Sequence, residues 1–139
     1  MSRPELILDP LIALAALTYL VLLRLPYVRF RAIFAGESRL EDYKHFHAPH
    51  LPAELSVPNR AYMNLLELPT LFYAVCLALC VVGKVSELDH VLAWSYVGLR
   101  VVHAFVHLSY NRVLHRLTLF AASNFVLAAL WVRLWLALH

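Results

Sequence analysis

The chain has 139 residues, of which 62% are hydrophobic and 15% are charged, and its mean hydropathy is +0.67. These values exclude an ordinary soluble globular protein and indicate a small integral membrane protein of one domain. The formal net charge of +3 comes from basic residues spread beside apolar stretches rather than gathered in a solvated patch, which argues against nucleic-acid binding.

Four apolar stretches are long enough to cross a hydrocarbon core, which needs roughly 20 apolar residues per helix. The sequence predicts helices at about residues 7–25, 57–82, 88–110 and 115–138, with one long cytoplasmic-side loop at about 26–56. The expected fold class is therefore all-α: an integral membrane four-helix bundle that forms a single transmembrane domain over residues 1–139.

The first stretch is led by Glu5 and Asp9 rather than by a basic run, so we interpret it as a membrane helix and not as a cleaved signal peptide. The long loop that follows carries His45, His47 and His50, which could ligate zinc or copper. No carboxylate or cysteine stands at a tight spacing to complete such a site, so no metal is predicted.

Two prolines mark the second stretch. Ser56 followed by Pro58 is typical of a helix start, because serine caps the helix and proline in the first turn loses no hydrogen bond. Pro69 lies deeper and cannot donate to the carbonyl of Leu65. We therefore expect a bend just past Glu67.

Basic residues are concentrated in the connection from the first to the second helix and in the turn from the third to the fourth. Because cationic loops are retained on the cytoplasmic side, both termini should face away from the cytoplasm. In a prokaryote the host membrane would be the inner or plasma membrane. The basic residues of these connections are Arg24, Arg29, Arg31, Arg39, Lys44, Arg60, Arg112 and Arg116.

Two polar stripes run inside the apolar stretches. Spacings of three and four residues place the members of each stripe on one helix face. An ionised residue near the bilayer centre costs roughly 2.5 to 3.5 kcal/mol, so the stripes should face the bundle interior. They are Arg60, Asn64 and Glu67 in the second stretch and Arg100, His103 and His107 in the third.

The two stripes match in depth. With a rise of about 1.5 Å per residue, Glu67 lies roughly 13 Å inside the membrane boundary and Arg100 roughly 16 Å. We expect these two side chains to face each other. An interhelical lock needs only one such pair, whereas a polar track that continues to the cytoplasmic surface is what a hydrophilic ligand requires.

The side chains of the stripes narrow the ligand class. Arginine binds carboxylates bidentately, asparagine offers a donor and an acceptor, and glutamate accepts from an ammonium group. The set suits a zwitterionic, peptide-like molecule with several carboxylates. Three glycines leave no phosphate loop, and the two histidines of the third stretch lack a third metal ligand.

The stripes read Arg60-x-x-x-Asn64-x-x-Glu67 and Arg100-x-x-His103-x-x-x-His107, and Arg112 and Arg116 follow. This pattern resembles the MAPEG family, the membrane-associated proteins in eicosanoid and glutathione metabolism, which includes microsomal glutathione transferases. The resemblance covers essentially the whole chain. It implies a left-handed four-helix bundle that assembles as a homotrimer, with glutathione held as co-substrate between subunits near the cytosolic face. A lipophilic electrophile or hydroperoxide would arrive from the bilayer.

Position by position, the resemblance implies that Arg60, Asn64 and Glu67 bind glutathione from the second helix. Arg100 and His103 would line or support the site from the third helix.

The resemblance further implies that an arginine near the start of the fourth helix stabilises the thiolate. Arg116 fits this role by spacing, and Arg112 is its rival. A cation close to a thiol favours the anion and raises the thiolate fraction at neutral pH.

Two more positions are implied by the resemblance. The arginine of the family's first helix matches either Arg29 or Arg31. A tyrosine often found on the third helix is His107 here, and Tyr110 lies one turn on.

Two functions fit these residues. The first is a glutathione-dependent transferase or peroxidase that attacks lipophilic electrophiles with an arginine-stabilised thiolate. The second is a non-catalytic lipid-binding protein or an accessory subunit of a larger membrane complex, in which the polar stripes serve as interhelical locks. The expected partners are other copies of the chain, lipids and a lipophilic small molecule.

Overall fold

The computed structural model describes residues 4–39, 41 and 53–139. The residues in these ranges form helices and no strands, which confirms the predicted all-α class. Within the same ranges, four helical segments are long and apolar enough to cross a membrane, as predicted. The three loop histidines, His45, His47 and His50, lie outside the described residues. The elements are the 3-10 helix η1 (Pro4–Ile7) and the helices α1 (Leu8–Phe34), α2 (Ala53–Leu66), α3 (Pro69–Val82), α4 (Glu87–Leu108) and α5 (Val113–Leu138).

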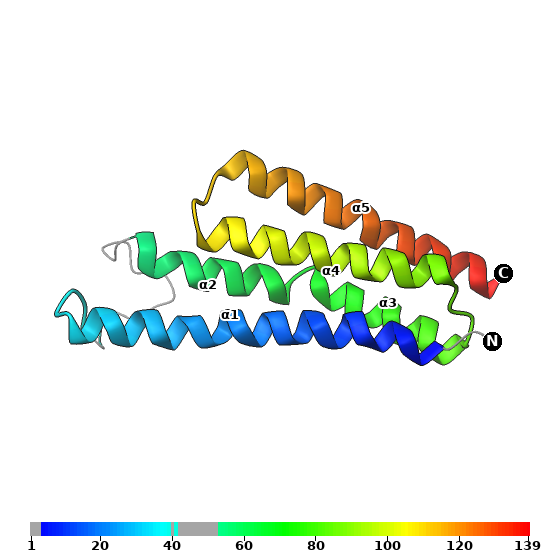
Figure 1. The fold of residues 1–139 in the computed structure, drawn as a ribbon, viewed down its shortest axis with the longest axis horizontal. Coiled ribbons are helices and arrows are strands. Elements are labelled where there is room, and N and C mark those ends of the chain that lie inside the picture. The colour runs from blue at the N-terminus through cyan, green and yellow to red at the C-terminus, as the bar shows by residue number, and fades with distance from the viewer. Residues whose placement is uncertain (1–3, 40, 42–52) are drawn as a thin grey trace.

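The four spans lie lengthwise beside one another, and both chain termini lie at the same end of the bundle (Figure 1). Helices α2 and α3 follow one another within the second span. Helix α5 packs along α4, but its first turns diverge from α4 toward the turn that joins them (Figure 1). The divergence is greatest at the end opposite the termini, which is where the candidate site lies.

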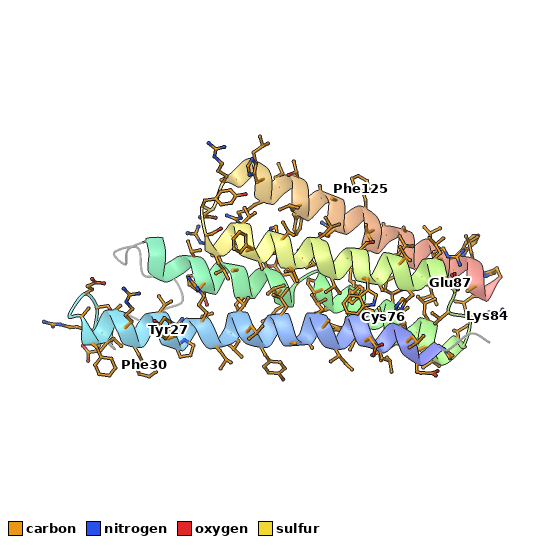
Figure 2. All side chains as sticks on the ribbon, viewed as in Figure 1. Tyr27, Phe30, Cys76, Lys84, Glu87 and Phe125 are labelled. Atoms are coloured by element: carbon orange, nitrogen blue, oxygen red, sulfur yellow. The ribbon has the colours of Figure 1, made fainter. Side chains whose placement is uncertain are left out.

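Apolar side chains fill the interior and also cover the outside. The ring of Phe72 in α3 stacks on that of Tyr96 in α4 with centroids 4.5 Å apart, and both side chains are fully buried. Tyr27, Phe30 and Phe125 are each more than half exposed and point away from the bundle (Figure 2). An apolar surface of this extent is stable against lipid rather than water.

The second span is broken at the position predicted from Pro69. Helix α2 ends at Leu66 and α3 begins at Pro69, because proline has no N–H to donate to the carbonyl of Leu65. The Thr70 hydroxyl donates to the Glu67 carbonyl at 2.6 Å, and the Thr70 N–H donates to the same oxygen at 3.1 Å. These bonds satisfy a backbone group that the break would otherwise leave free inside the membrane.

The bounds predicted for the first loop are wrong at both ends. Helix α1 continues through Pro26 to Phe34, and α2 begins at Ala53 rather than after Ser56. An internal proline removes one backbone hydrogen bond, and a helix that continues past it keeps the neighbouring ones. Helix α1 ends instead near Gly36, which has a left-handed φ of 76° that glycine adopts without strain.

Polar bonds join α4 to α5 at the end of the bundle that carries the termini. Ser86 and Asp89 form a capping box at the start of α4, in which the Ser86 N–H donates to Asp89 Oδ2 at 2.8 Å. Arg133 of α5 donates through Nε to Asp89 Oδ1 at 2.9 Å, and Lys84 Nζ donates to the Ala137 carbonyl at 2.9 Å. The Asp89 side chain is only 1% exposed and the Arg133 side chain is 35% exposed, so the carboxylate is shielded from water while the guanidinium remains partly hydrated.

Replacing Asp89 with alanine should lower the free energy of unfolding by about 2 to 3 kcal/mol, because a helix cap and a charge-assisted hydrogen bond are lost together. The thermal unfolding midpoint in mild detergent measures the effect. Glu87→Gln is the matched control, since Glu87 is an exposed acid in the same helical turn. Equal midpoints for the two variants would contradict a stabilising role for the Asp89 pair.

Candidate functional site

A cleft of about 220 Å³ opens among α2, α4 and α5 at the end opposite the termini, and we call it the site cleft. Helix α2 contributes Asn64, α4 contributes His103 and the first turns of α5 contribute Arg116. These three predicted site residues come from different helices, and the structure brings them to one cleft. The remaining lining residues are Val113, Leu117 and Phe120.

Arg100 lies behind Asn64 and ties α4 to α2. Its side chain is completely buried, and its Nη2 donates to the Asn64 backbone oxygen at 2.7 Å and to Asn64 Oδ1 at 2.6 Å. The Phe120 ring lies 6.0 Å from the guanidinium carbon, at the outer limit of a cation–π contact. A buried guanidinium is costly without hydrogen-bond partners. Only Nη2 is satisfied here, because Nε and Nη1 are buried without a partner among the described residues.

The expected contact between Arg100 and Glu67 is not formed. The Glu67 side chain is exposed, and the described part of the chain contains no ion pair between it and Arg100. Glu67 lies just past the end of α2 and immediately before the break at Pro69, and its side chain turns to the outside of the bundle. Glu67 acts on Arg100 only through longer-range electrostatics.

The bond from Arg100 determines which end of the Asn64 amide faces the site cleft. Arginine only donates, so the Asn64 atom that accepts must be the amide oxygen. The amide nitrogen Nδ2 has no partner within the described ranges and is not buried. Asn64 Oδ1 is therefore held by Arg100, and the amide nitrogen is available to the site cleft as a hydrogen-bond donor.

Arg116 is the cation of the site cleft. Its Nη1 donates to Oδ1 of Asn111, which has a left-handed φ of 49° in the α4–α5 turn, at a distance of 2.9 Å. The positive charge of Arg60 acts on both Arg116 and His107. Among the residues described, neither Arg100 nor Arg116 forms an ion pair with a carboxylate. An anion bound here would therefore meet positive charge that is not already neutralised.

His107 lies beside the site cleft rather than in its wall. Its side chain is 1% exposed, and its ring centroid is 6.0 Å from that of His103. Both ring nitrogens are buried without a partner in the described part of the chain. His107 is therefore packed inside the bundle, and the site cleft does not reach its ring nitrogens.

Five other predicted residues lie outside the lining of the site cleft. Arg60 is exposed on α2. Arg112 is exposed just before α5, and the exposed Tyr110 has its hydroxyl 3.0 Å from Nδ1 of His115. Arg29 and Arg31 lie in the last two turns of α1, where Arg29 is half-buried and Arg31 is exposed. Of the two arginines near the start of α5, Arg116 is the one that lines the cleft.

The sequence predicted neither Asn111 nor Phe120 as site residues. Asn111 does carry a signal, since asparagine tolerates the left-handed conformation and here occupies a short turn between two helices. Phe120 carries none, because it is one of many apolar residues in the last span.

A family model described as the MAPEG family matches residues 7–136, which is nearly the whole chain. No curated protein and no solved structure matches the chain. The matched range includes both polar stripes, the break at Pro69 and all six residues that line the site cleft. The match confirms the resemblance inferred from the sequence: the chain is an integral membrane protein that belongs to the MAPEG family.

Proposed function

We propose that this chain is a glutathione-dependent membrane transferase or peroxidase, which binds glutathione in the site cleft and attacks lipophilic electrophiles with its thiolate. Membership of the MAPEG family relates the chain to eicosanoid and glutathione metabolism. The observation that carries the finer proposal is the polarity of the cleft, because the Asn64 amide nitrogen and the Arg116 guanidinium are both available as donors.

Donors in the cleft wall favour an anionic ligand. Carboxylates and thiolates accept hydrogen bonds from such groups, and charge-assisted bonds are roughly twice as strong as neutral ones. The exposed Glu67 beside the helix break remains able to accept from an ammonium group. Glutathione has carboxylates, an ammonium group and a thiol, so its chemistry matches this set of side chains.

Arg116 would act through its charge. A guanidinium beside the bound thiol favours the thiolate, and the proton would leave to water at the open side of the cleft. The thiolate would then attack an electrophilic carbon, a carbon–sulfur bond would form, and the leaving group would depart with its electron pair. Val113 and Leu117 are 74% and 59% exposed in the apolar wall, so a lipophilic reactant can reach them from the bilayer.

One copy of the chain supplies only part of a ligand site. The site cleft holds about 220 Å³, whereas pockets for small ligands commonly hold roughly 300 to 1,000 Å³. Arg60 on α2 and Glu67 just past the end of α2 are both exposed beside the cleft wall that Asn64 forms. These features support a homotrimer in which a neighbouring copy closes the cleft, as the family resemblance implies.

The distribution of charge supports an orientation with the site cleft toward the cytoplasm. Arg112 and Arg116 flank the α4–α5 turn, and further arginines lie in the last turns of α1. Among the described residues, Lys84 and Arg133 are the basic side chains near the opposite end. By the positive-inside rule this distribution favours an orientation with both termini away from the cytoplasm. The host membrane would be the inner or plasma membrane if the cell is prokaryotic.

A non-catalytic accessory or lipid-binding role is the second candidate. The observation that favours it is the Arg100–Asn64 bond, because a polar stripe that serves only as an interhelical lock needs no more than such a pair. The chain would then work as a subunit of a larger membrane complex. If the protein does not bind glutathione at millimolar glutathione concentration, the non-catalytic role is favoured over the enzymatic one.

Arg116→Gln should raise the pKa of the bound glutathione thiol and lower the thiolate fraction at neutral pH about tenfold, since one pKa unit corresponds to about 1.4 kcal/mol. Glutamine keeps a donor for Asn111, so the turn should stay folded. The ultraviolet absorbance of the thiolate, titrated against pH, measures the change. Arg112→Gln is the matched control, because Arg112 is exposed outside the cleft lining. If only the control loses the thiolate, the assignment of Arg116 is wrong.

Asn64→Asp should weaken glutathione binding at least about tenfold while leaving the protein folded. Aspartate still accepts from Arg100, but it turns an acceptor toward the ligand where asparagine presents a donor. Isothermal calorimetry measures the binding, and the thermal unfolding midpoint checks the fold. Asn59→Asp is the matched control, since Asn59 lies on α2 outside the cleft lining. Unchanged glutathione affinity in Asn64→Asp would refute the proposal that the Asn64 amide nitrogen donates to the ligand.

Native mass spectrometry in mild detergent should find three copies of the chain in one complex, because a neighbouring copy is needed to close the site cleft. Glutathione should bind to this complex and not to a dissociated single chain. A single chain that binds glutathione as tightly as the assembled form would contradict the shared site.

A further inference from the structure

A second cleft of about 260 Å³ lies between α1, the start of α2 and the end of α4. It shares no lining residue with the site cleft, and the proposed glutathione chemistry does not use it. Its lining combines apolar side chains with three polar ones. The residues that matter here are Arg24, Val28, Val57, Leu108, Ser109 and Asn111.

The second cleft lies at the boundary of the membrane-spanning region. Val57 is the first residue of the second apolar span, and Leu108 is the last residue of the third. Both residues line the cleft. In a bilayer this level is occupied by lipid head groups and the adjoining interfacial region.

The polar groups of the second cleft are two donors and one acceptor. Arg24 is exposed and forms no hydrogen bond or ion pair with the described residues. Asn111 Oδ1 accepts from Arg116, and this bond fixes the orientation of the amide. The Asn111 amide nitrogen is the group that can donate to a ligand. The Ser109 hydroxyl donates to the Phe105 carbonyl at 2.6 Å, which leaves its oxygen as an acceptor.

We propose that the second cleft binds the head group of an acidic glycerophospholipid from the surrounding bilayer. The phosphate accepts from Arg24 and from the amide nitrogen of Asn111, because a phosphate offers only acceptors to these donors. A head-group hydroxyl, as in phosphatidylglycerol, donates to Ser109. The glycerol backbone packs on Val28 and Leu108. A lipid with a choline head group carries a cation that Arg24 repels and has no hydroxyl for Ser109.

This lipid site shares no lining residue with the site cleft, although Asn111 also accepts from Arg116. The proposal does not rest on glutathione binding, and it is tested on the full chain. The chain is reconstituted in nanodiscs of phosphatidylcholine alone or of an equal mixture with phosphatidylglycerol, released into mild detergent, and analysed for retained lipid by native mass spectrometry. Wild-type protein should retain phosphatidylglycerol in preference to phosphatidylcholine. Arg24→Gln should reduce the retained phosphatidylglycerol about fivefold, the factor expected for one basic contact at an anionic surface. Val28→Trp, which fills the cleft without a change of charge, should reduce it to a similar extent.

Arg31→Gln is the matched control for charge. Arg31 is exposed on the same helix as Arg24 and does not line the second cleft, so this variant should retain lipid like the wild type. Equal losses in Arg24→Gln and Arg31→Gln would mean a diffuse attraction of anionic lipid to a basic surface and would overturn the proposal. Full retention in Val28→Trp would also overturn it.

Soluble glycerol phosphate separates a lipid from a free phosphate as the ligand. It lacks acyl chains and should leave the thermal unfolding midpoint of the wild type unchanged, whereas phosphatidylglycerol should raise it. If glycerol phosphate raises the midpoint as strongly as phosphatidylglycerol does, the assignment to a bilayer lipid is wrong.

Discussion

The bond between Arg100 and Asn64 is the constraint on which the rest of the structure depends. A guanidinium inside a membrane span needs oxygen acceptors, and Arg100 finds a backbone oxygen and an amide oxygen on the same residue. The two bonds hold α2 against α4 just before the second span breaks at Pro69. The bent part of the bundle is therefore anchored by a buried charge, and the apolar packing of Phe72 on Tyr96 begins on the far side of the break.

At the end of the bundle opposite the termini, two asparagines each accept a hydrogen bond from an arginine. Asn64 accepts from Arg100 and Asn111 accepts from Arg116, so each amide oxygen is committed to an arginine. Each amide nitrogen is left as a donor, one in the site cleft and one in the second cleft. Arginines paired with neutral amides also keep their full charge. Both clefts are thus suited to anions, which we propose to be glutathione in one and a phospholipid head group in the other.

Composition and single residues predicted most of the fold, whereas the contacts within the site depend on how the helices pack. The lengths of the apolar stretches predicted four spans, and Pro69 predicted the break because an internal proline removes one defined hydrogen bond. The first apolar stretch predicted a helix end at about residue 25, which is too early, because α1 continues to Phe34 and ends near the left-handed Gly36. Helical spacing placed Arg100 and Glu67 at matching depth, but periodicity carries no information on which way a side chain beside a helix break turns. Arg100 therefore meets the oxygens of Asn64 rather than the Glu67 carboxylate.

The most direct test is an experimental structure of the chain in lipid nanodiscs with glutathione bound. We predict that a glutathione carboxylate lies within hydrogen-bond distance of Asn64 Nδ2, that the sulfur lies beside Arg116, and that Arg100 still donates to Asn64 Oδ1. A structure in which Arg100 itself binds the ligand, or in which Asn64 turns its oxygen toward the cleft, would contradict the central role of the Arg100–Asn64 bond.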